Sequence, residues 1–380
     1  MNRRILLFAL VAVLLMTTTA FSQDRPKLHL MPVPSKVELG SGALRIDAGF
    51  LIRQNGRTDE RVDRAIERLY QRLTLKLAMP IPPVKLPSQT PRILDIDCAG
   101  PGSRIQQARE DESYDLEIRP DGAKLKAANP LGIMHGLETF YQLVSVGADN
   151  YGTVPVISIH DQPRFPWRGL LLDVSRHFLP IPQIERTIDG LAAVKLNVLH
   201  LHLSDDQGFR AAAEHAPELA EKGSRGQYYT KAELKGLVEY ARDRGVRIVP
   251  EFDMPGHTTA WLASHPELAT VTGKTYEPAT AYGVLEDVLD PTNPKLFKLL
   301  DKLIGDMTEI FPDEYFHIGG DEVVYKQWNA SPAITEFRKQ HNLADGKALQ
   351  AWFNTEVAKI VKKHHRRMVG WNEILRGEIP

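Results

Sequence analysis

From residue 169 onward, short apolar runs alternate with amphipathic stretches of helical period, and this alternation constrains the fold more than any other feature. Strands are predicted at 169–174, 198–202, 246–249, 315–318 and 368–371, with helices at 184–194, 230–244, 293–307 and 346–364. Thr230 opens one helix with a capping box, because Glu233 lies three residues on. Alternating β and α units predict a parallel sheet. No Gly-x-Gly-x-x-Gly follows any of these strands, so a dinucleotide-binding fold is not expected.

The predicted strands end in side chains that can bind ligands or transfer protons. In chain order these are Asp173, Arg176 and His177; His200, His202, Asp205 and Asp206; Glu251, Asp253 and His257; Asp321 and Glu322; and Trp371 with Glu373. Each alone has an ordinary reading: an ion pair, a helix cap, a loop histidine or a core tryptophan. Together, at the carboxyl ends of parallel strands, they are typical of a (β/α)8 TIM-barrel enzyme.

Asp321 and Glu322 are adjacent carboxylates that follow a short apolar run. Neighbouring residues on a regular strand point to opposite faces, so both can enter one pocket only if the strand ends or bends there. Gly319 and Gly320 allow that bend, because glycine adopts backbone angles that other residues avoid. Paired carboxylates at such a place suit acid–base chemistry, although a solvated pair at a strand end has the same pattern.

Residues 28–160 read as a mixed domain without a catalytic constellation. The pattern predicts a helix at 59–77, a strand at 92–98, a hairpin of 114–118 with 123–127 around a turn at 120–122, and a helix at 132–144. A linker rich in Asp and Pro follows at 161–166. The predicted organisation is therefore an α+β domain over 23–162 and a barrel over 163–380.

Composition bounds the class of protein. The net charge is −1 and 43% of residues are hydrophobic, without a basic stripe, so neither nucleic acid nor an anionic membrane surface is an expected partner. Residues 1–22 combine Arg3 and Arg4 with an apolar run at 5–16, which predicts a signal peptide and export to the periplasm or the extracellular space. That run is short for a membrane anchor, so no membrane insertion is expected after cleavage. The single cysteine, Cys98, cannot form an intrachain disulfide and is expected in the core.

Two kinds of chemistry remain open from the residues alone. His200 and His202 lie on one face of a strand, as in metal-dependent barrel hydrolases, with only His257 and His317 as further candidate ligands. A neutral sugar fits the other residues better. Arg176 can donate two hydrogen bonds to hydroxyls, and Trp371 can stack on a pyranose or its substituent.

Five stretches carry a resemblance to a known family. They are RGLLLDVSRHF at 168–178, KLNVLHLHLSDDQGFR at 195–210, VPEFDMPGH at 249–257, HIGGDEV at 317–323 and GWNEI at 370–374. In this order they resemble the family 20 glycoside hydrolases, the β-N-acetylhexosaminidases. The segment 28–160 is similar to the smaller domain that precedes the barrel in that family.

The resemblance implies a mechanism and a role for each matching residue. It implies removal of terminal β-linked N-acetylhexosamine with retention, in which the substrate's own 2-acetamido carbonyl is the nucleophile. Glu322 matches the general acid/base, and Asp321 the residue that orients the acetamido group. The substrate-binding matches are Arg176 for ring hydroxyls, Asp205 and His257 for the polar relay near the acid/base with Asp253 as its neighbour, and Trp371 for the acetamide pocket. Neither metal nor cofactor is implied.

The sequence departs from the family in length. A barrel of this type usually needs about 250 residues and eight strands, whereas five predicted strands occupy 168–380. We therefore expect an incomplete barrel that carries the catalytic pair with only part of its pocket. An inactive barrel that still binds sugar, and less favourably a metal-dependent hydrolase, are the alternatives.

Overall fold

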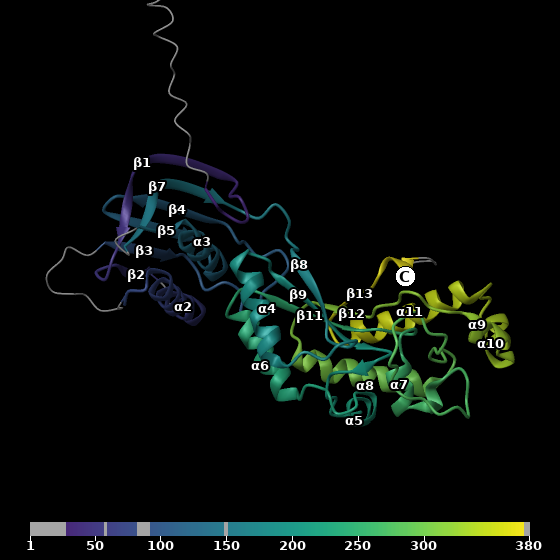
Figure 1. Cartoon of the computed structure of the whole chain (residues 1–380). Helices are drawn as coiled ribbons and strands as arrows, with labels where there is room; N and C mark the ends of the chain where they lie inside the picture. Colours follow the sequence, from purple (N-terminus) through teal and green to yellow (C-terminus); the bar gives the residue numbers. More distant parts are fainter. Residues whose placement is uncertain (1–27, 57–58, 82–91, 148–150, 376–380) are drawn as a thin grey trace, which may run out of the picture.

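Two sheets organise the chain in the computed structural model, which describes residues 28–56, 59–81, 92–147 and 151–375 (Figure 1). The predicted signal peptide at 1–22 lies outside these residues and stays a prediction. Within the described residues, no helix is both long enough and apolar enough to cross a membrane. The first sheet belongs to an N-terminal domain, and the second to a barrel-like domain below it in the figure.

The N-terminal sheet is mixed and runs in the order β1-β7-β4-β5-β3-β2, with β6 paired to β7. Its strands are β1 (Lys36–Ile46), β2 (Leu51–Gly56), β3 (Ile93–Cys98), β4 (Tyr114–Arg119), β5 (Gly122–Ala127), β6 (Ser145–Val146) and β7 (Gly152–Asp161). The predicted hairpin is confirmed, because β4 and β5 are antiparallel with Arg119 opposite Gly122. Along β4, buried and exposed residues alternate strictly, so one face of the sheet is covered and the other is open to solvent.

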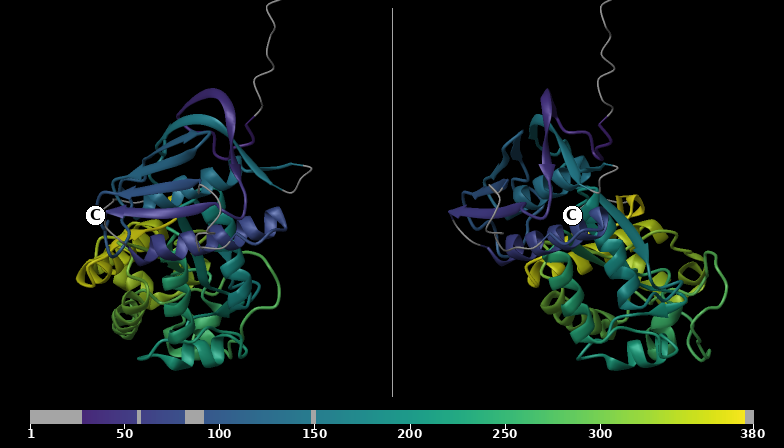
Figure 2. Two further views of the ribbon diagram at one scale, coloured as in Figure 1. Left: turned by 90° about the vertical axis from the view of Figure 1, so that its left-hand side faces the viewer. Right: turned by 60° about the vertical axis from the view of Figure 1, so that its left-hand side comes forward.

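Helices α2 (Glu60–Leu77) and α3 (Pro130–Leu143) cover the apolar face of this sheet. Asp59 and Asn129 cap their first turns by accepting backbone N–H groups. Cys98 is 4% exposed and lies in the domain core, as predicted. Figure 2 shows α2 running between the sheet and the helices of the second domain, so this helical layer is what the barrel packs against.

The second sheet contains the predicted parallel strands in chain order. They are β8 (Gly169–Asp173), β9 (Val198–Asp205), β11 (Arg247–Phe252), β12 (Tyr315–His317) and β13 (Arg367–Val369), with β10 (Gly208–Phe209) folded back antiparallel on β9. The helices are α4 (Ile181–Ala193), α5 (Pro217–Gly223), α6 (Lys231–Arg242), α7 (Thr259–Ser264), α8 (Pro294–Ile310), α9 (Lys326–Ala330), α10 (Pro332–Gln340) and α11 (Gly346–Lys363). The capping box of Thr230 and Glu233 is present at the start of α6.

Within the described residues the barrel is partial. Among the parallel strands, β8 pairs only with β9 and β13 only with β12, so the sheet is open at both edges. Leu170 and Leu171 on the β8 edge are 46% and 38% exposed. Two predicted strands end three residues too early. The second continues past His202 through Asp205, and the third continues past Val249 through Phe252, which puts Asp205 and Glu251 inside strands rather than beyond them.

A buried polar cluster joins the two domains. Lys195, at the end of α4, donates from Nζ to the Tyr114 hydroxyl at 2.8 Å and to Asp161 Oδ2 at 3.0 Å. Beside it, Asn197 Nδ2 donates to Glu112 Oε1 at 2.7 Å. These contacts tie the start of the barrel to β4 and β7 of the first domain, and we call Tyr114, Asp161 and Lys195 the interdomain cluster.

Candidate active site

The backbone bends between β12 and the two adjacent carboxylates, as the glycines predict. Gly319 and Gly320 have φ angles of 65° and 90°, and Glu322 itself has a φ of 50°. A Cβ on Gly319 would lie 1.9 Å from Asp253 Oδ1, so no larger residue fits there. This bend turns both Asp321 and Glu322 toward the carboxyl edge of the sheet.

Both carboxylates converge on one imidazole. Nε2 of His257 lies 3.4 Å from Glu322 Oε2 and 3.9 Å from Asp321 Oδ2. The Glu322 side chain is 51% exposed, and that of Asp321 is 23% exposed. Asp321 Oδ1 is nevertheless a buried atom without a hydrogen-bond partner among the described residues. One carboxylate therefore opens to solvent, while the other keeps a sheltered oxygen free to accept a hydrogen bond.

His257 is held on its other side by a pair of buried aspartates. Its Nδ1 lies 3.3 Å from Asp206 Oδ2 and 3.4 Å from Asp205 Oδ1. Asp206 is fixed in turn, because its Oδ1 accepts the backbone N–H of Thr259 at 3.0 Å. Burial alone lowers the pKa of His257, but its contacts with Asp205 and Asp206 raise that pKa to about 11. A cationic imidazole thus faces the carboxylate pair.

Arg176 reaches the same cluster from the end of β8. Its guanidinium lies 2.7 Å from Asp173 Oδ2 and 2.7 Å from Asp205 Oδ2, and its side chain is 33% exposed. Burial raises the pKa of Asp205, but its contacts with His202 and His257 lower it below the usual range. Two carboxylates therefore orient Arg176, while part of its guanidinium group remains accessible to a ligand.

Asp253 lies beneath the bend and supports it. Its Oδ1 accepts the Gly320 N–H at 2.9 Å, and the residue is 1% exposed. Burial, followed by the nearby Asp321, raises its pKa well above the usual range. Its place beneath the glycines makes Asp253 a support for the backbone of the carboxylate pair.

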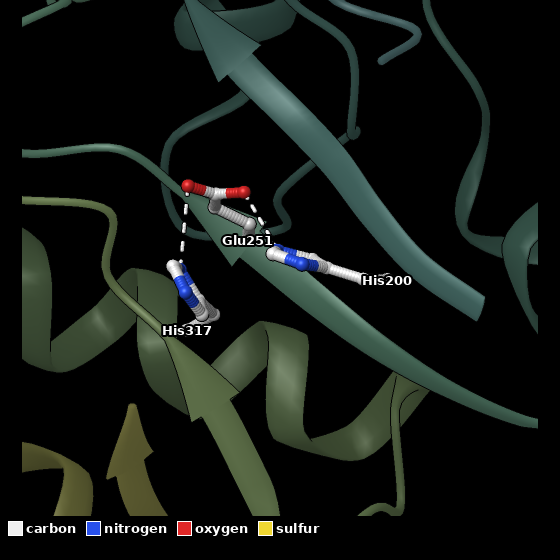
Figure 3. A group of neighbouring side chains, drawn as sticks. All are labelled: His200, Glu251 and His317. Carbon is white, nitrogen blue, oxygen red and sulfur yellow. Dashed lines mark ion pairs between the residues drawn. The ribbon is translucent and has the colours of Figure 1, made fainter. Parts of the chain in front are cut away.

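Glu251 lies at the centre of the sheet among three imidazoles and one indole. Its Oε2 lies 2.7 Å from His200 Nε2 and 2.8 Å from His202 Nδ1, and its Oε1 lies 3.3 Å from His317 Nδ1. Figure 3 shows His200 and His317 on either side of this carboxylate. Oε1 also accepts the Trp371 indole N–H at 2.9 Å.

All the predicted site residues therefore lie at one edge of the sheet. The contacts join Arg176, Asp205 and His257 to the carboxylate pair, and Asp253 lies beneath it. Trp371 is held at the same edge by its hydrogen bond to Glu251. Sequence reasoning assigned no role to Asp173, Asp206 and Glu251, and considered His202 only as a candidate metal ligand. The one signal for the first three was their position within four residues of a predicted strand end.

The geometry bears on the metal-site alternative. His200 and His202 do share one face of β9, since both contact Glu251. Two ligand atoms on one tetrahedral zinc ion lie about 3.3 Å apart, given zinc–nitrogen distances near 2.0–2.1 Å. The contacts of 2.7 and 2.8 Å from Glu251 to these histidines are shorter and match direct pairing of a carboxylate with imidazoles. His200, Glu251 and His317 nevertheless lie close enough together to hold an ion, and His200 Nε2 and Glu251 Oε2 have no hydrogen-bond partner among the described residues, so the metal alternative is decided by experiment.

Both domains of the chain match models of one protein family. The family model "Glycosyl hydrolase family 20, catalytic domain" matches residues 165–379, and "Glycosyl hydrolase family 20, domain 2" matches residues 27–162. The beta-hexosaminidase subunit beta of Felis catus is 37% identical over 287 residues, which are 74% of this chain and 52% of the relative. The human subunit beta is 38% identical over 269 residues, covering 70% of this chain and 47% of the relative. The chain thus spans about half the length of the curated relatives it matches.

Solved structures share the fold over nearly the whole chain. A chitobiase from Flavobacterium johnsoniae superimposes with a TM-score of 0.86 at 39% identity, covering 92% of this chain and 54% of that one. An N-acetyl-beta-hexosaminidase from Streptomyces plicatus gives a TM-score of 0.77 at 32% identity, covering 93% and 68%. These neighbours indicate a (β/α)8 barrel preceded by a smaller domain, of which the described residues form a partial barrel. Since the two family models together cover both domains, the chain belongs to glycosyl hydrolase family 20.

Proposed function

We propose that this chain carries the acid/base pair of a glycosidase that removes terminal β-linked N-acetylhexosamine from oligosaccharides or glycoconjugates. The observation that carries the proposal is the convergence of Asp321 and Glu322 on His257, with one exposed carboxylate and one sheltered, unpaired oxygen. The names of the relatives, beta-hexosaminidase and chitobiase, support the same substrate class.

Glu322 is the proton donor and acceptor in this proposal. Its half-exposed carboxyl group can reach the glycosidic oxygen, and His257 lies 3.4 Å behind it. In the first step Glu322 protonates the leaving oxygen as the bond to the anomeric carbon breaks. In the second step it takes a proton from the water that attacks this carbon, which restores the acid.

Asp321 positions the nucleophile, which the substrate supplies. The 2-acetamido carbonyl oxygen forms a bond to the anomeric carbon as the leaving group departs, and positive charge develops on the acetamido nitrogen. Asp321 Oδ1 is available to accept the N–H of that group, since it has no hydrogen-bond partner among the described residues. The carboxylate thereby orients the amide and stabilises its charge.

Arg176 and Trp371 bind the sugar on either side of this centre. Arg176 is anchored by Asp173 and Asp205 and presents its remaining N–H groups to ring hydroxyls. Trp371 is fixed by Glu251 and offers its ring as one wall of the acetamide pocket. The five parallel strands fit the first part of an eight-stranded barrel. Export follows from the predicted signal peptide, and the scheme requires neither metal nor cofactor.

The test is hydrolysis of a chromogenic aryl β-N-acetylglucosaminide by residues 23–380, with and without EDTA. Whatever turnover these residues support should persist in EDTA and be lost in Glu322→Gln. Saturable binding of N-acetylglucosamine without hydrolysis would replace the glycosidase with the sugar-binding alternative. Activity lost in EDTA and restored by a divalent cation would contradict the proposal in favour of metal-dependent hydrolysis.

A further inference from the structure

A buried chain of four side chains links the two parts of the site. The Trp371 indole N–H donates to Glu251 Oε1 at 2.9 Å, Glu251 Oε2 lies 2.8 Å from His202 Nδ1, and His202 Nε2 lies 2.9 Å from Asp205 Oδ2. The register explains the meeting, because Glu251 on β11 pairs with His202 on β9. We call Trp371, Glu251, His202 and Asp205 the buried relay.

The geometry of His202 defines its protonation. Each of its ring nitrogens faces a carboxylate oxygen, from Glu251 on one side and Asp205 on the other. A neutral imidazole has one nitrogen with a lone pair, which would here face an anionic oxygen. Only the doubly protonated ring places no lone pair against either oxygen. It donates from Nε2 to Asp205 and forms an ion pair from Nδ1 with Glu251 Oε2, which has no aligned hydrogen-bond partner among the described residues, so a positive charge lies between two buried negative charges.

The neighbouring groups leave this charge on His202. His317 Nδ1 accepts the Gly319 N–H at 3.0 Å and lies 3.3 Å from Glu251 Oε1, farther than the 2.8 Å of His202 Nδ1 from Oε2, so it donates no proton to Glu251. Burial lowers the pKa of His200, which favours its neutral form. Burial also lowers the pKa of His202, but its contacts with Asp205 and Glu251 raise that pKa to about 10.

The far end of the relay meets three further charged or titratable groups. Arg176 contacts Asp205 Oδ2 at 2.7 Å, and His257 lies 3.4 Å from Asp205 Oδ1. Asp253 belongs to the same group of close side chains as His202 and Asp205. Asp205 can hold both Arg176 and His257 only while it is ionised, and the charge of His202 supports that state.

We propose that Glu251 is a positioning residue that keeps His202 doubly protonated and thereby sets the placement of Asp205, Arg176 and Trp371. Glu251 is 0% exposed, so it does not touch a ligand itself. One of its oxygens holds the aromatic wall, and the other acts through His202 on the groups that hold Arg176 and His257. The two sides of the sugar pocket are thus coupled through a single buried carboxylate.

The protonation of His202 is independent of catalysis, whereas its effect on turnover rests on the proposed function. Histidine-selective ¹⁵N labelling and NMR titration measure the first directly, with the His202 resonances assigned by their loss in His202→Gln. The variant is Glu251→Gln, which keeps the shape and removes the charge. The control is Asp306→Asn, because Asp306 is a 4% exposed carboxylate on α8 that accepts His215 Nδ1 at 2.6 Å, outside the relay.

We expect His202 of the full chain to carry two ring protons at pH 8. In Glu251→Gln its acid dissociation constant rises about 100-fold, which corresponds to a fall of two in pKa. Asp306→Asn leaves His202 unchanged. Titration of His202 near the ordinary value of 6.5 in the unsubstituted protein overturns the proposal, even if Glu251→Gln does not fold. An unchanged His202 in a folded Glu251→Gln variant overturns it as well.

The second arm is the pH profile of aryl β-N-acetylglucosaminide hydrolysis. Glu251→Gln is expected to lower kcat/KM about twofold at pH 8 and about 50-fold at pH 10, because a fall of two in the pKa of His202 moves the alkaline limb of the profile to lower pH. A merely structural role would lower activity equally at all pH values, and that result overturns the catalytic part. If the unsubstituted chain hydrolyses nothing, the proposed function fails, while the NMR result still decides the role of Glu251 in the relay.

Discussion

Two polar clusters in this chain both bring ionisable side chains together but differ in whether their buried atoms have hydrogen-bond partners. In the interdomain cluster, the ammonium of Lys195 is held by the Tyr114 hydroxyl and by Asp161. At the candidate site, His257 Nε2 and Asp321 Oδ1 are buried atoms without hydrogen-bond partners among the described residues. Buried polar atoms are normally paired, so the difference separates a cluster that stabilises the fold from one arranged for a ligand.

The substitution expected to change activity most is at Glu322, and it should do so without changing stability. Glu322→Gln keeps the side-chain shape but removes the proton donor, so kcat for an aryl β-N-acetylglucosaminide should fall about 10³-fold. The side chain is half exposed, so the free energy of unfolding should change by less than about 0.5 kcal/mol. Urea unfolding with steady-state kinetics measures both. Glu336→Gln, an exposed position on α10, is the control, and an equal loss of activity there would contradict the assignment.

A substitution in the interdomain cluster should lower the stability of the protein and leave kcat/KM unchanged, the reverse of the effect expected for Glu322→Gln. Lys195→Met leaves Asp161 buried without its cation, and breaking a buried pair in this way costs about 3–5 kcal/mol. Urea unfolding of the variant should show this loss, while kcat/KM of the folded fraction stays unchanged. Adding Asp161→Asn should recover part of the stability. A fall in kcat/KM without a change in stability would break the distinction between the two clusters.

A pH-dependent effect of similar or smaller size is expected from His135, which lies beside Glu112 at the domain boundary. Burial lowers the pKa of His135 from 6.5 to about 4. Because the folded state prefers the neutral ring, this contribution is present above pH 6.5 and is lost as the pH falls toward 4. It amounts to at most about 3 kcal/mol, from 1.36 kcal/mol per pKa unit.

The measurement is the free energy of unfolding between pH 7 and 4.5 for the unsubstituted protein and for His135→Gln. The variant should lose less stability over this interval, since its side chain does not titrate. Parallel curves for the two proteins would remove His135 from the account.

The smallest effect is expected away from both clusters, at the start of α6. Thr230 accepts the Glu233 N–H and forms a capping box with the Glu233 side chain. Thr230→Ala should therefore cost about 1 kcal/mol of unfolding free energy without altering kcat/KM. Thr230→Ser, which keeps the hydroxyl, is the matched control. A loss of kcat/KM in Thr230→Ala but not in Thr230→Ser would mean that the site responds to stability alone, which would contradict the distinction between the two clusters.

The sequence predicts the barrel strands well because each is a short apolar run between amphipathic helices. It predicts the N-terminal sheet less completely. β1 pairs with β7, with Lys36 opposite His160 and a register shift between Leu39 and Ala43. Such a pairing of distant segments has no local signal, and β1 lacks a clean alternation of buried and exposed residues.

The candidate site also has a part that the local sequence predicts and a part that depends on pairing between distant strands. The bend at Gly319 and Gly320 is local, so two adjacent glycines before two carboxylates predict it. The role of Glu251 depends on the register that sets it opposite His202 and on the continuation of β11 through Phe252. Neither is encoded by spacing within one segment, which is why the sequence places Glu251 at the correct edge but assigns it no partner.

The most direct test of the central claim compares two substrates that differ only in the 2-acetamido group. Asp321 is proposed to orient that group, so kcat/KM for an aryl β-N-acetylglucosaminide should exceed that for the matching β-glucoside by at least about 10³-fold. Asp321→Asn should reduce most of this preference, because the loss falls on the acetamido substrate. Equal hydrolysis of both substrates, or a preference unchanged in Asp321→Asn, would contradict the account.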